Sequence, residues 1–236
     1  MFFRKKKTLE QTGFFGNFVD YHCHILPGVD DGVADMATSL EILRRYEELG
    51  VSTVWFTPHV MEDMPNTTEA LKARFEELME AYTKEVNDGN RRALELHLAA
   101  EYMLDDGFEE RLERKDLLTL GTRDQVLVET SYYNPPINMV ERLNLIKSKG
   151  YYPVLAHPER YMYMDKKDYK QLKDMGIRFQ LNLGSLSNGY GSLVKKKALK
   201  MLNDGWYQYR GTDCHRMSMV DLILQAEAPK ELQTNN

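Results

Sequence analysis

Histidine and acidic residues recur in short clusters along this chain of 236 residues. In DYHCHILPGVDDG (20–32), His22 and His24 flank one residue and two aspartates follow, and in GTDCH one residue separates Asp213 from His215. A strand presents alternate residues to the same face, so each pair would point one way. Imidazole and carboxylate groups are common ligands of zinc, manganese and iron. The spacing therefore predicts a metal site.

The same residue types recur at the carboxyl ends of predicted strands, with one more in the loop after the first strand. The candidate ligands number nine: His22, His24, Asp31, His59, Glu101, Glu129, His157, Asp213 and His215. This number exceeds what one ion can use, so we expect two or three ions a few ångströms apart. We interpret Asp30 as a turn residue only, and His97, within the third strand, as a satisfied core histidine.

The elements that would position these residues alternate along nearly the whole chain. We predict strands over 18–24, 52–57, 94–101, 125–130, 152–157, 178–183 and 206–215. We predict helices over 36–49, 68–88, 137–148, 166–175, 191–204 and 217–226. About seven βα units imply parallel strands, and they favour a closed or nearly closed barrel of the α/β class. In such a barrel the carboxyl ends of the strands form one rim, where side chains from distant units converge.

Composition limits the class of protein. The chain is 42% hydrophobic with a formal charge of −5, which predicts one globular domain and gives no basic face for nucleic acid. We place this domain at 18–226, after a partly flexible segment (1–17) and before a C-terminal tail (227–236). No apolar run approaches the roughly 18 residues of a transmembrane helix, and MFFRKKK lacks the apolar core of a signal peptide. These features predict a cytoplasmic protein.

The two cysteines are too few for a disulfide framework. Cys23 and Cys214 lie between the paired ligands, so they should point outward, toward the helices. If barrel closure makes the first and last strands neighbours, the two thiols lie close together. We expect buried, reduced packing residues.

Clustered ions together with an arginine point to phosphate chemistry. A metal ion lowers the pKa of bound water from about 15.7 to about 7, which gives a metal-bound hydroxide, and it neutralises charge on a phosphoryl group. In AHPERY (156–161), Arg160 follows His157 by three residues. Its planar fork of donors matches a phosphate dianion. Phosphate ester hydrolysis therefore fits the sequence, and a structural ion pair is the alternative role for Arg160.

Several motifs, in their order along the chain, resemble the polymerase and histidinol phosphatase (PHP) superfamily. These are HCHILPGVDDG, TPH, AAEY, LVET, LAHPERY, QLNLGSL and GTDCH. Within the superfamily the match is closest to the CpsB-type protein-tyrosine phosphatases of bacterial capsule and exopolysaccharide synthesis. The resemblance runs from about Phe18 to about Leu222, and the combination of HxHILPGxDDG with AHPERY is highly specific.

The resemblance implies a distorted (β/α)7 barrel, similar to a TIM barrel, with two or three divalent ions, usually manganese, with iron or zinc as alternatives. The first ion would be held by His22, His24, Glu101 and Asp213. Glu101 would bridge to a second ion, held also by Glu129 and His157. The third would be held by Asp31, His59 and His215. The residues expected to be catalytic are Arg160, Glu101 and Asp213.

The family's substrates are phosphotyrosines in the flexible C-terminal tail of an autophosphorylated bacterial tyrosine kinase, so the enzyme would regulate polysaccharide synthesis. Through this kinase a cytoplasmic phosphatase would lie near the inner face of the membrane. Arg160 resembles the family's phosphate-binding arginine. Arg216 stands where asparagine is common, and it could add a phosphate contact that another arginine usually provides.

Other classes remain as alternatives. A small-molecule phosphatase of the histidinol phosphatase type shares the superfamily and its metals. An amidohydrolase also begins with HxH, but it commonly relies on a carboxylated lysine where Glu129 stands here. A non-catalytic metal-binding module would not need the complete ligand set.

A cysteine-dependent tyrosine phosphatase is excluded. That mechanism requires an arginine six positions after the nucleophilic cysteine. Here Val29 follows Cys23 at that spacing, and Val220 follows Cys214. Neither cysteine meets the requirement.

Overall fold

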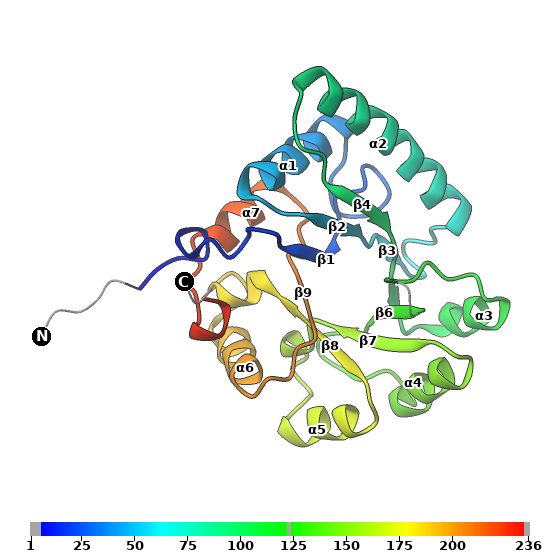
Figure 1. Cartoon of the computed structure of the whole chain (residues 1–236). Helices are drawn as coiled ribbons and strands as arrows, with labels where there is room; N and C mark the ends of the chain where they lie inside the picture. Colours follow the sequence, from blue (N-terminus) through cyan, green and yellow to red (C-terminus); the bar gives the residue numbers. More distant parts are fainter. Residues whose placement is uncertain (1–5, 122–123, 234–236) are drawn as a thin grey trace, which may run out of the picture.

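The computed structural model describes residues 6–121 and 124–233, and within them strands alternate with helices (Figure 1). The strands are β1 (Val19–Cys23), β2 (Thr53–Phe56), β3 (His59–Val60), β4 (Glu95–Leu98), β5 (Glu101–Met103), β6 (Gln125–Glu129), β7 (Tyr152–Ala156), β8 (Arg178–Asn182) and β9 (Tyr209–Gly211). The α-helices are α1 (Met36–Leu49), α2 (Thr68–Gly89), α3 (Asp106–Arg114), α4 (Met139–Ser148), α5 (Lys166–Asp174), α6 (Ser192–Asn203) and α7 (Met217–Leu224). Short 3₁₀ turns are η1 (Glu10–Thr12), η2 (Pro158–Arg160), η3 (Leu183–Leu186) and η4 (Lys230–Leu232).

The strands form two parallel sheets with the orders β1-β2-β4 and β3-β5-β6-β7-β8-β9. The barrel closes between β1 and the segment after β9. There the His24 amide donates to the Cys214 carbonyl at 2.9 Å and the Asp213 amide to the His22 carbonyl at 2.7 Å. The predicted distorted (β/α)7 barrel is confirmed, and Cys23 and Cys214 are bridge partners, both fully buried.

The prediction of one continuous strand over 94–101 is wrong, because this stretch is divided between β4 and β5. The adjacent strand segment is divided at the same level, between β2 and β3, because Pro58 has no backbone N–H to donate. The Ala99 amide donates to the Phe56 carbonyl and the Glu101 amide to the Pro58 carbonyl, which join the two sheets across the break. The chain therefore turns at this level while still completing the barrel.

Helix α3 lies in a stretch for which the sequence pattern predicted no helix. Asp105 caps it by accepting a hydrogen bond from the Phe108 amide, and Phe108 and Leu112 bury one side of it. Its apolar face is only two residues long within nine, so periodicity gave a weak signal. This helix completes the third βα unit.

The main apolar core lies between the sheets and the surrounding helices, and Cys23 and Cys214 belong to it. A second, small cluster comprises Ala99, Leu120, Leu127, Val154 and Ala156, with Trp55 and Tyr209 packed against it. Alternation along the strands separates these two cores. Helices α1 and α2 lie together beside β1, β2 and β4, and α3 to α6 follow around the other strands (Figure 1).

The described parts of the two terminal segments pack against each other beside the end of the domain. The Leu9 amide donates to the Ala226 carbonyl and the Ala228 amide to the Lys7 carbonyl, both at 2.9 Å. Leu9 and Phe15 are buried. Residues 1–5 and 234–236 of the predicted flexible segment and tail lie outside the described residues. Among the helices that the structure describes, none is long and apolar enough to cross a membrane.

Candidate metal centre

The candidate ligands meet at the carboxyl ends of the strands. Ligand atoms within 4.8 Å of one another form four overlapping groups: His22/His24/Asp213, His22/Glu101/His157, His59/Glu101/Glu129 and His24/Asp31/His59/His215. All nine residues named from the sequence are in these groups. All are buried except His215, which is half-buried, and Asp31, which is exposed.

Glu101 lies at the middle of this cluster and is fully buried. Its Oε2 lies 3.2 Å from His22 Nε2, 3.3 Å from His24 Nε2 and 3.2 Å from His59 Nδ1. Its Oε1 lies 3.0 Å from His157 Nε2. One carboxylate thus reaches four imidazoles from three separate segments, an arrangement that suits a ligand shared between ions.

Buried polar atoms at the centre lack hydrogen bonds within the described residues. Glu101 Oε2 and His59 Nδ1 both lack one, and His22 Nε2 and His24 Nε2 face each other at 2.9 Å. Leaving buried polar groups unpaired is costly, and facing imidazole nitrogens cannot both accept. Divalent cations among these lone pairs would satisfy them together, so the donor set fits manganese, iron or zinc.

The electrostatics of the cluster lead to the same conclusion. Burial disfavours a charged His22, but the charges of Glu101 and Asp213 prevail and raise its pKa to about 9. Burial also opposes ionisation of Asp213, yet the charge of His22 and the hydrogen bond from His24 lower its pKa. The buried carboxylates are thus stabilised by positive charge beside them, which a divalent cation would also supply once the imidazoles lost their protons.

Two residues that were not predicted as site residues orient the imidazoles. Gln180 Oε1 accepts hydrogen bonds from His22 Nδ1 at 3.0 Å and from the His157 amide at 3.2 Å. Asp30 Oδ2 accepts from His24 Nδ1 at 2.9 Å and from the His59 amide at 3.1 Å. A partner on Nδ1 leaves Nε2 free to bind a metal.

The interpretation of Asp30 as a turn residue only is therefore wrong. It does accept a turn hydrogen bond from the Gly32 amide at 3.0 Å, but its other oxygen holds His24. The sequence did contain a signal that Gln180 and Asn182 face the site. In RFQLNL (178–183) these two polar residues alternate with apolar ones, so they fall on one face of β8, and both are buried.

A third unpredicted residue, Asp20, joins β1 to the segment after β9, close to the cluster. It accepts hydrogen bonds from the Thr212 amide at 2.8 Å, the Thr212 hydroxyl at 2.7 Å and the His22 amide at 3.2 Å. Burial raises its pKa to about 6 despite these donors. This network fixes the strand that carries His22 against the segment that carries Asp213.

The backbone is strained at two of the candidate ligands. His157 has φ 31° and Asp213 has φ 51°, in the left-handed region that residues with a Cβ rarely adopt. Such conformations cost on the order of 1–3 kcal/mol and persist where surrounding contacts determine them. Here they turn two ligands back into the barrel mouth.

Arg160 lies beside the cluster in a fixed orientation. Its Nη1 donates to Asp213 Oδ2 at 2.8 Å, and the same oxygen accepts from Asn182 Nδ2 at 2.6 Å. The guanidinium carbon lies 4.2 Å from the ring centroid of Tyr132 and 4.4 Å from that of Tyr190. The two rings and the ion pair hold the donor fork of Arg160 next to the candidate ligands.

Arg216 and His97 have different surroundings. Arg216 precedes α7 and is exposed, directly after His215. The prediction that His97 is a core histidine is wrong: it stacks on Trp55 at 4.4 Å between ring centroids and pairs with Glu95 at 2.8 Å, and 35% of its side chain is exposed. It takes no part in the cluster.

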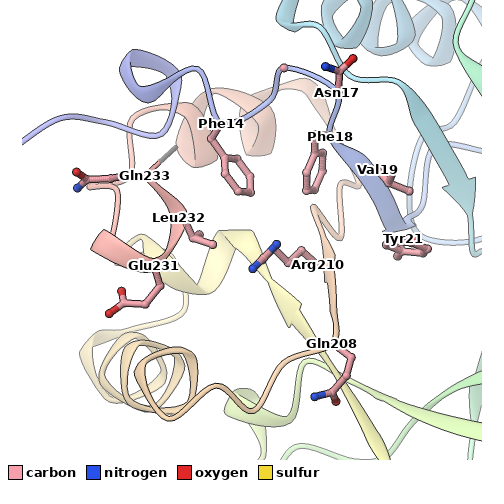
Figure 2. A pocket seen from close by; sticks show the side chains of 11 residues that line it. Phe14, Asn17, Phe18, Val19, Tyr21, Gln208, Arg210, Glu231, Leu232 and Gln233 are labelled. Atoms are coloured by element: carbon pink, nitrogen blue, oxygen red, sulfur yellow. The ribbon is translucent and has the colours of Figure 1, made fainter. Parts of the chain in front are cut away.

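A cavity of about 480 Å³ lies at the other end of the barrel, lined by Phe14, Gly16, Asn17, Phe18, Val19, Tyr21, Gln208, Arg210, Glu231, Leu232 and Gln233. Figure 2 shows Arg210 extending from β9 toward η4, with the rings of Phe14 and Phe18 nearby. Val19 begins β1, so this is the amino end of the strands. None of the candidate ligands lines this cavity.

Comparison with known proteins gives consistent results over most of the chain. The chain is 28% identical over 204 residues to tyrosine-protein phosphatase YwqE of Bacillus subtilis, covering 84% of this chain and 78% of that protein. It is 29% identical over 206 residues to tyrosine-protein phosphatase CpsB of Streptococcus pneumoniae, covering 84% and 83%.

A solved structure, from work on YwqE of Bacillus subtilis and CpsB of Streptococcus pneumoniae as unique metal-dependent tyrosine phosphatases, superimposes with a TM-score of 0.75 and 28% identity. The superposition covers 86% of this chain and 81% of that one. The family model for capsular polysaccharide synthesis, CpsB/CapC, matches residues 18–223. The chain therefore belongs to the CpsB/CapC family.

Proposed function

We propose that this chain is a metal-dependent protein-tyrosine phosphatase whose PHP-type domain spans residues 18–226. The observation that carries the proposal is the central position of Glu101, whose Oε2 lies among three imidazole nitrogens without a hydrogen bond from the described residues. The family's metal-dependent tyrosine phosphatases support the same conclusion.

In this proposal the ligands divide among three ions, with manganese expected first and iron or zinc as alternatives. His22, His24 and Asp213 would hold the first ion together with Glu101, which would also serve the second. Glu129 and His157 complete the second ion. The third ion takes the remaining residues, Asp31, His59 and His215. The groups of ligand atoms within 4.8 Å support this division. The first and third sets each lie within one group apart from Glu101, and the second set is drawn from two groups that share Glu101.

The ions, when bound, activate water and neutralise negative charge on the phosphoryl group. Arg160 binds the outer phosphate oxygens, because its fork is fixed beside the cluster by Asp213, Tyr132 and Tyr190. Asp213 serves both as ligand and as the anchor of this arginine. Arg216, exposed and adjacent to His215, supplies a second phosphate contact.

The proposed substrate is phosphotyrosine in the flexible C-terminal tail of an autophosphorylated bacterial tyrosine kinase. Tyrosinate is a weaker base than an aliphatic alkoxide, so it leaves without strong help from a general acid. A flexible segment can also enter the barrel mouth more readily than a folded surface. The enzyme would act in the cytoplasm, near the membrane through its kinase partner, and would regulate capsule or exopolysaccharide synthesis.

The test compares two substrates on one preparation. Metal-stripped protein is reloaded with manganese, iron, zinc or magnesium, and release of phosphate from a phosphotyrosyl peptide and from histidinol phosphate is measured. We expect turnover of the peptide, restored by a transition metal and insensitive to vanadate. Efficient hydrolysis of histidinol phosphate with negligible action on phosphotyrosine would assign the chain to the small-molecule phosphatases instead.

A further inference from the structure

Positive charge is concentrated in one stretch of a chain that is acidic as a whole. Residues 158–205 contain eight lysines and two arginines against five acidic residues, a net charge of +5, whereas the whole chain carries −5. This stretch contains η2, α5, β8, η3 and α6. The asymmetry concentrates positive charge in this part of the fold.

Four of these lysines lie at the same end of the barrel as the candidate metal centre. Lys166 and Lys167 begin α5, and Lys195 and Lys196 lie early in α6. Each helix follows a strand, so its first turns lie at the carboxyl ends of the strands. We call these four residues the basic rim.

Contacts place the early part of α6 against the entry to α5. Lys197 Nζ donates to the Tyr161 carbonyl at 2.6 Å and to the Met164 carbonyl at 3.0 Å. Lys166 and Lys197 also line one cavity of about 240 Å³ between the two helices, together with Tyr169 and Trp206. The two halves of the basic rim are therefore neighbours.

The ammonium groups of the basic rim form no hydrogen bond or ion pair within the described residues. Lysines later in the same helices do: Lys170 pairs with Asp174 at 2.6 Å and Lys200 with Asp204 at 3.6 Å. The nearby Asp165 and Asp168 are occupied in a capping box at the start of α5. A positive charge in the first turn also opposes the helix dipole, so stability does not explain Lys166 and Lys167.

The α5 half of the basic rim follows closely in sequence on Arg160, the proposed phosphate-binding residue. Arg160 ends η2, and residues 161–165 lead from it to Lys166. On this path Met162 is 48% exposed, and Leu193, at the start of α6, is 51% exposed. Exposed apolar side chains thus accompany the basic rim on the segments that follow β7 and β8.

We propose that the basic rim binds acidic side chains that flank the phosphotyrosine of the substrate, so that the enzyme prefers phosphopeptides with aspartate or glutamate beside the phosphorylated residue. This rests on the proposed phosphatase function and assigns its specificity. The occupant is an extended acidic peptide, since its charge complements four unpaired ammonium groups and an extended chain can reach both helices.

The test uses two peptides with the same phosphotyrosine, one flanked by acidic and one by neutral residues. The metal-loaded enzyme should have a KM about tenfold lower for the acidic peptide, and the difference should shrink as salt is raised. Lys166→Glu/Lys196→Glu should abolish this difference while leaving kcat and the hydrolysis of free phosphotyrosine within about twofold.

The matched control is Lys72→Glu/Lys84→Glu, which reverses two exposed lysines on α2 and changes the net charge equally. It should keep the preference. Equal KM values for both peptides in the parent enzyme, or equal loss in the control, would overturn the basic rim as a substrate site.

Direct binding separates the two proposals. Binding of non-hydrolysable acidic and neutral phosphopeptides is measured alongside turnover. Lysine-dependent binding of the acidic peptide without hydrolysis would leave the basic rim standing and refute the phosphatase function. Hydrolysis without any lysine-dependent preference would support the phosphatase function and refute the basic rim as a substrate site. Lysine-dependent binding to anionic vesicles, with no peptide preference, would assign the surface to a membrane and so overturn the proposal.

Discussion

The two ends of the barrel are built from the same strands and differ in chemistry. Toward its carboxyl end β1 carries His22 and leads into His24, and toward its amino end Val19 and Tyr21 line the cavity of Figure 2. The cavity at the amino end has a volume of about 480 Å³, but none of the candidate ligands lines it. The carboxyl end has converging ligand atoms. The difference shows that donor atoms, rather than empty volume, identify the candidate active site.

The ends also differ in what holds them together. Around the candidate metal centre, buried polar groups depend on one another, as with Asp20 and Thr212 or Gln180 and His22. At the amino end, Phe14, Phe15 and Phe18 pack in aromatic contacts with ring centroids 5.1 to 5.5 Å apart. Substitutions at the two ends should therefore affect different properties.

The largest effect is expected for Glu101→Gln. An amide cannot supply the shared negative charge, so turnover should fall by at least about a thousandfold while the protein remains folded. Steady-state kinetics, metal analysis and circular dichroism measure this. Near-normal turnover would show that Glu101 is not shared between ions.

Arg160→Ala should have the next largest effect. Loss of one fixed donor should cost about 2 to 4 kcal/mol of transition-state stabilisation, or about 30- to 1,000-fold in kcat/KM. Metal content should be unchanged, and Arg160→Lys should recover only part of the loss because a lysine lacks the fork. If the alanine variant loses its metals as well, Arg160 has a structural role through Asp213 instead.

A smaller loss is expected for Tyr190→Leu, which removes one of the two rings that hold Arg160. A desolvated cation–π contact is worth about 1 to 2 kcal/mol, so KM should rise about five- to thirtyfold with a smaller change in kcat. Tyr190→Phe retains the ring and should behave nearly as the parent protein. Equal losses in both variants would point instead to the hydroxyl near Asn182.

At the other end, Arg210→Ala should change turnover by less than about twofold, because its guanidinium lines the amino-end cavity and touches no candidate ligand. Metal content should equal that of the parent protein. A large loss of turnover in a folded, metal-replete variant would mean that the two ends are coupled, and the contrast between them would then fail.

Much of the carboxyl end could be predicted because local rules determine it. Alternation along a strand put His22 and His24 on one face, and the regular βα spacing brought all strand ends to one rim. The division of the strands near Pro58 was not predicted, since it depends on how neighbouring chains pair. Helix α3 was missed because only Phe108 and Leu112 mark its apolar face.

The residues around the ligands were harder to predict. Which acceptor each imidazole finds depends on tertiary contacts, as between His22 and Gln180, which are 158 positions apart. Tyr132 and Tyr190 come from loops, where no periodicity reports the direction of a side chain. Asp30 was interpreted from its turn alone, although an aspartate has two oxygens and can serve both a turn and a ligand.

Metal content compared with activity tests the central claim most directly. Protein purified without chelators is analysed for metals, stripped, assayed on a phosphotyrosyl peptide, and then reloaded with one metal at a time. We predict two or three transition-metal ions per chain, loss of turnover on stripping, and recovery with manganese, iron or zinc. Full phosphatase activity in metal-free protein would contradict the account.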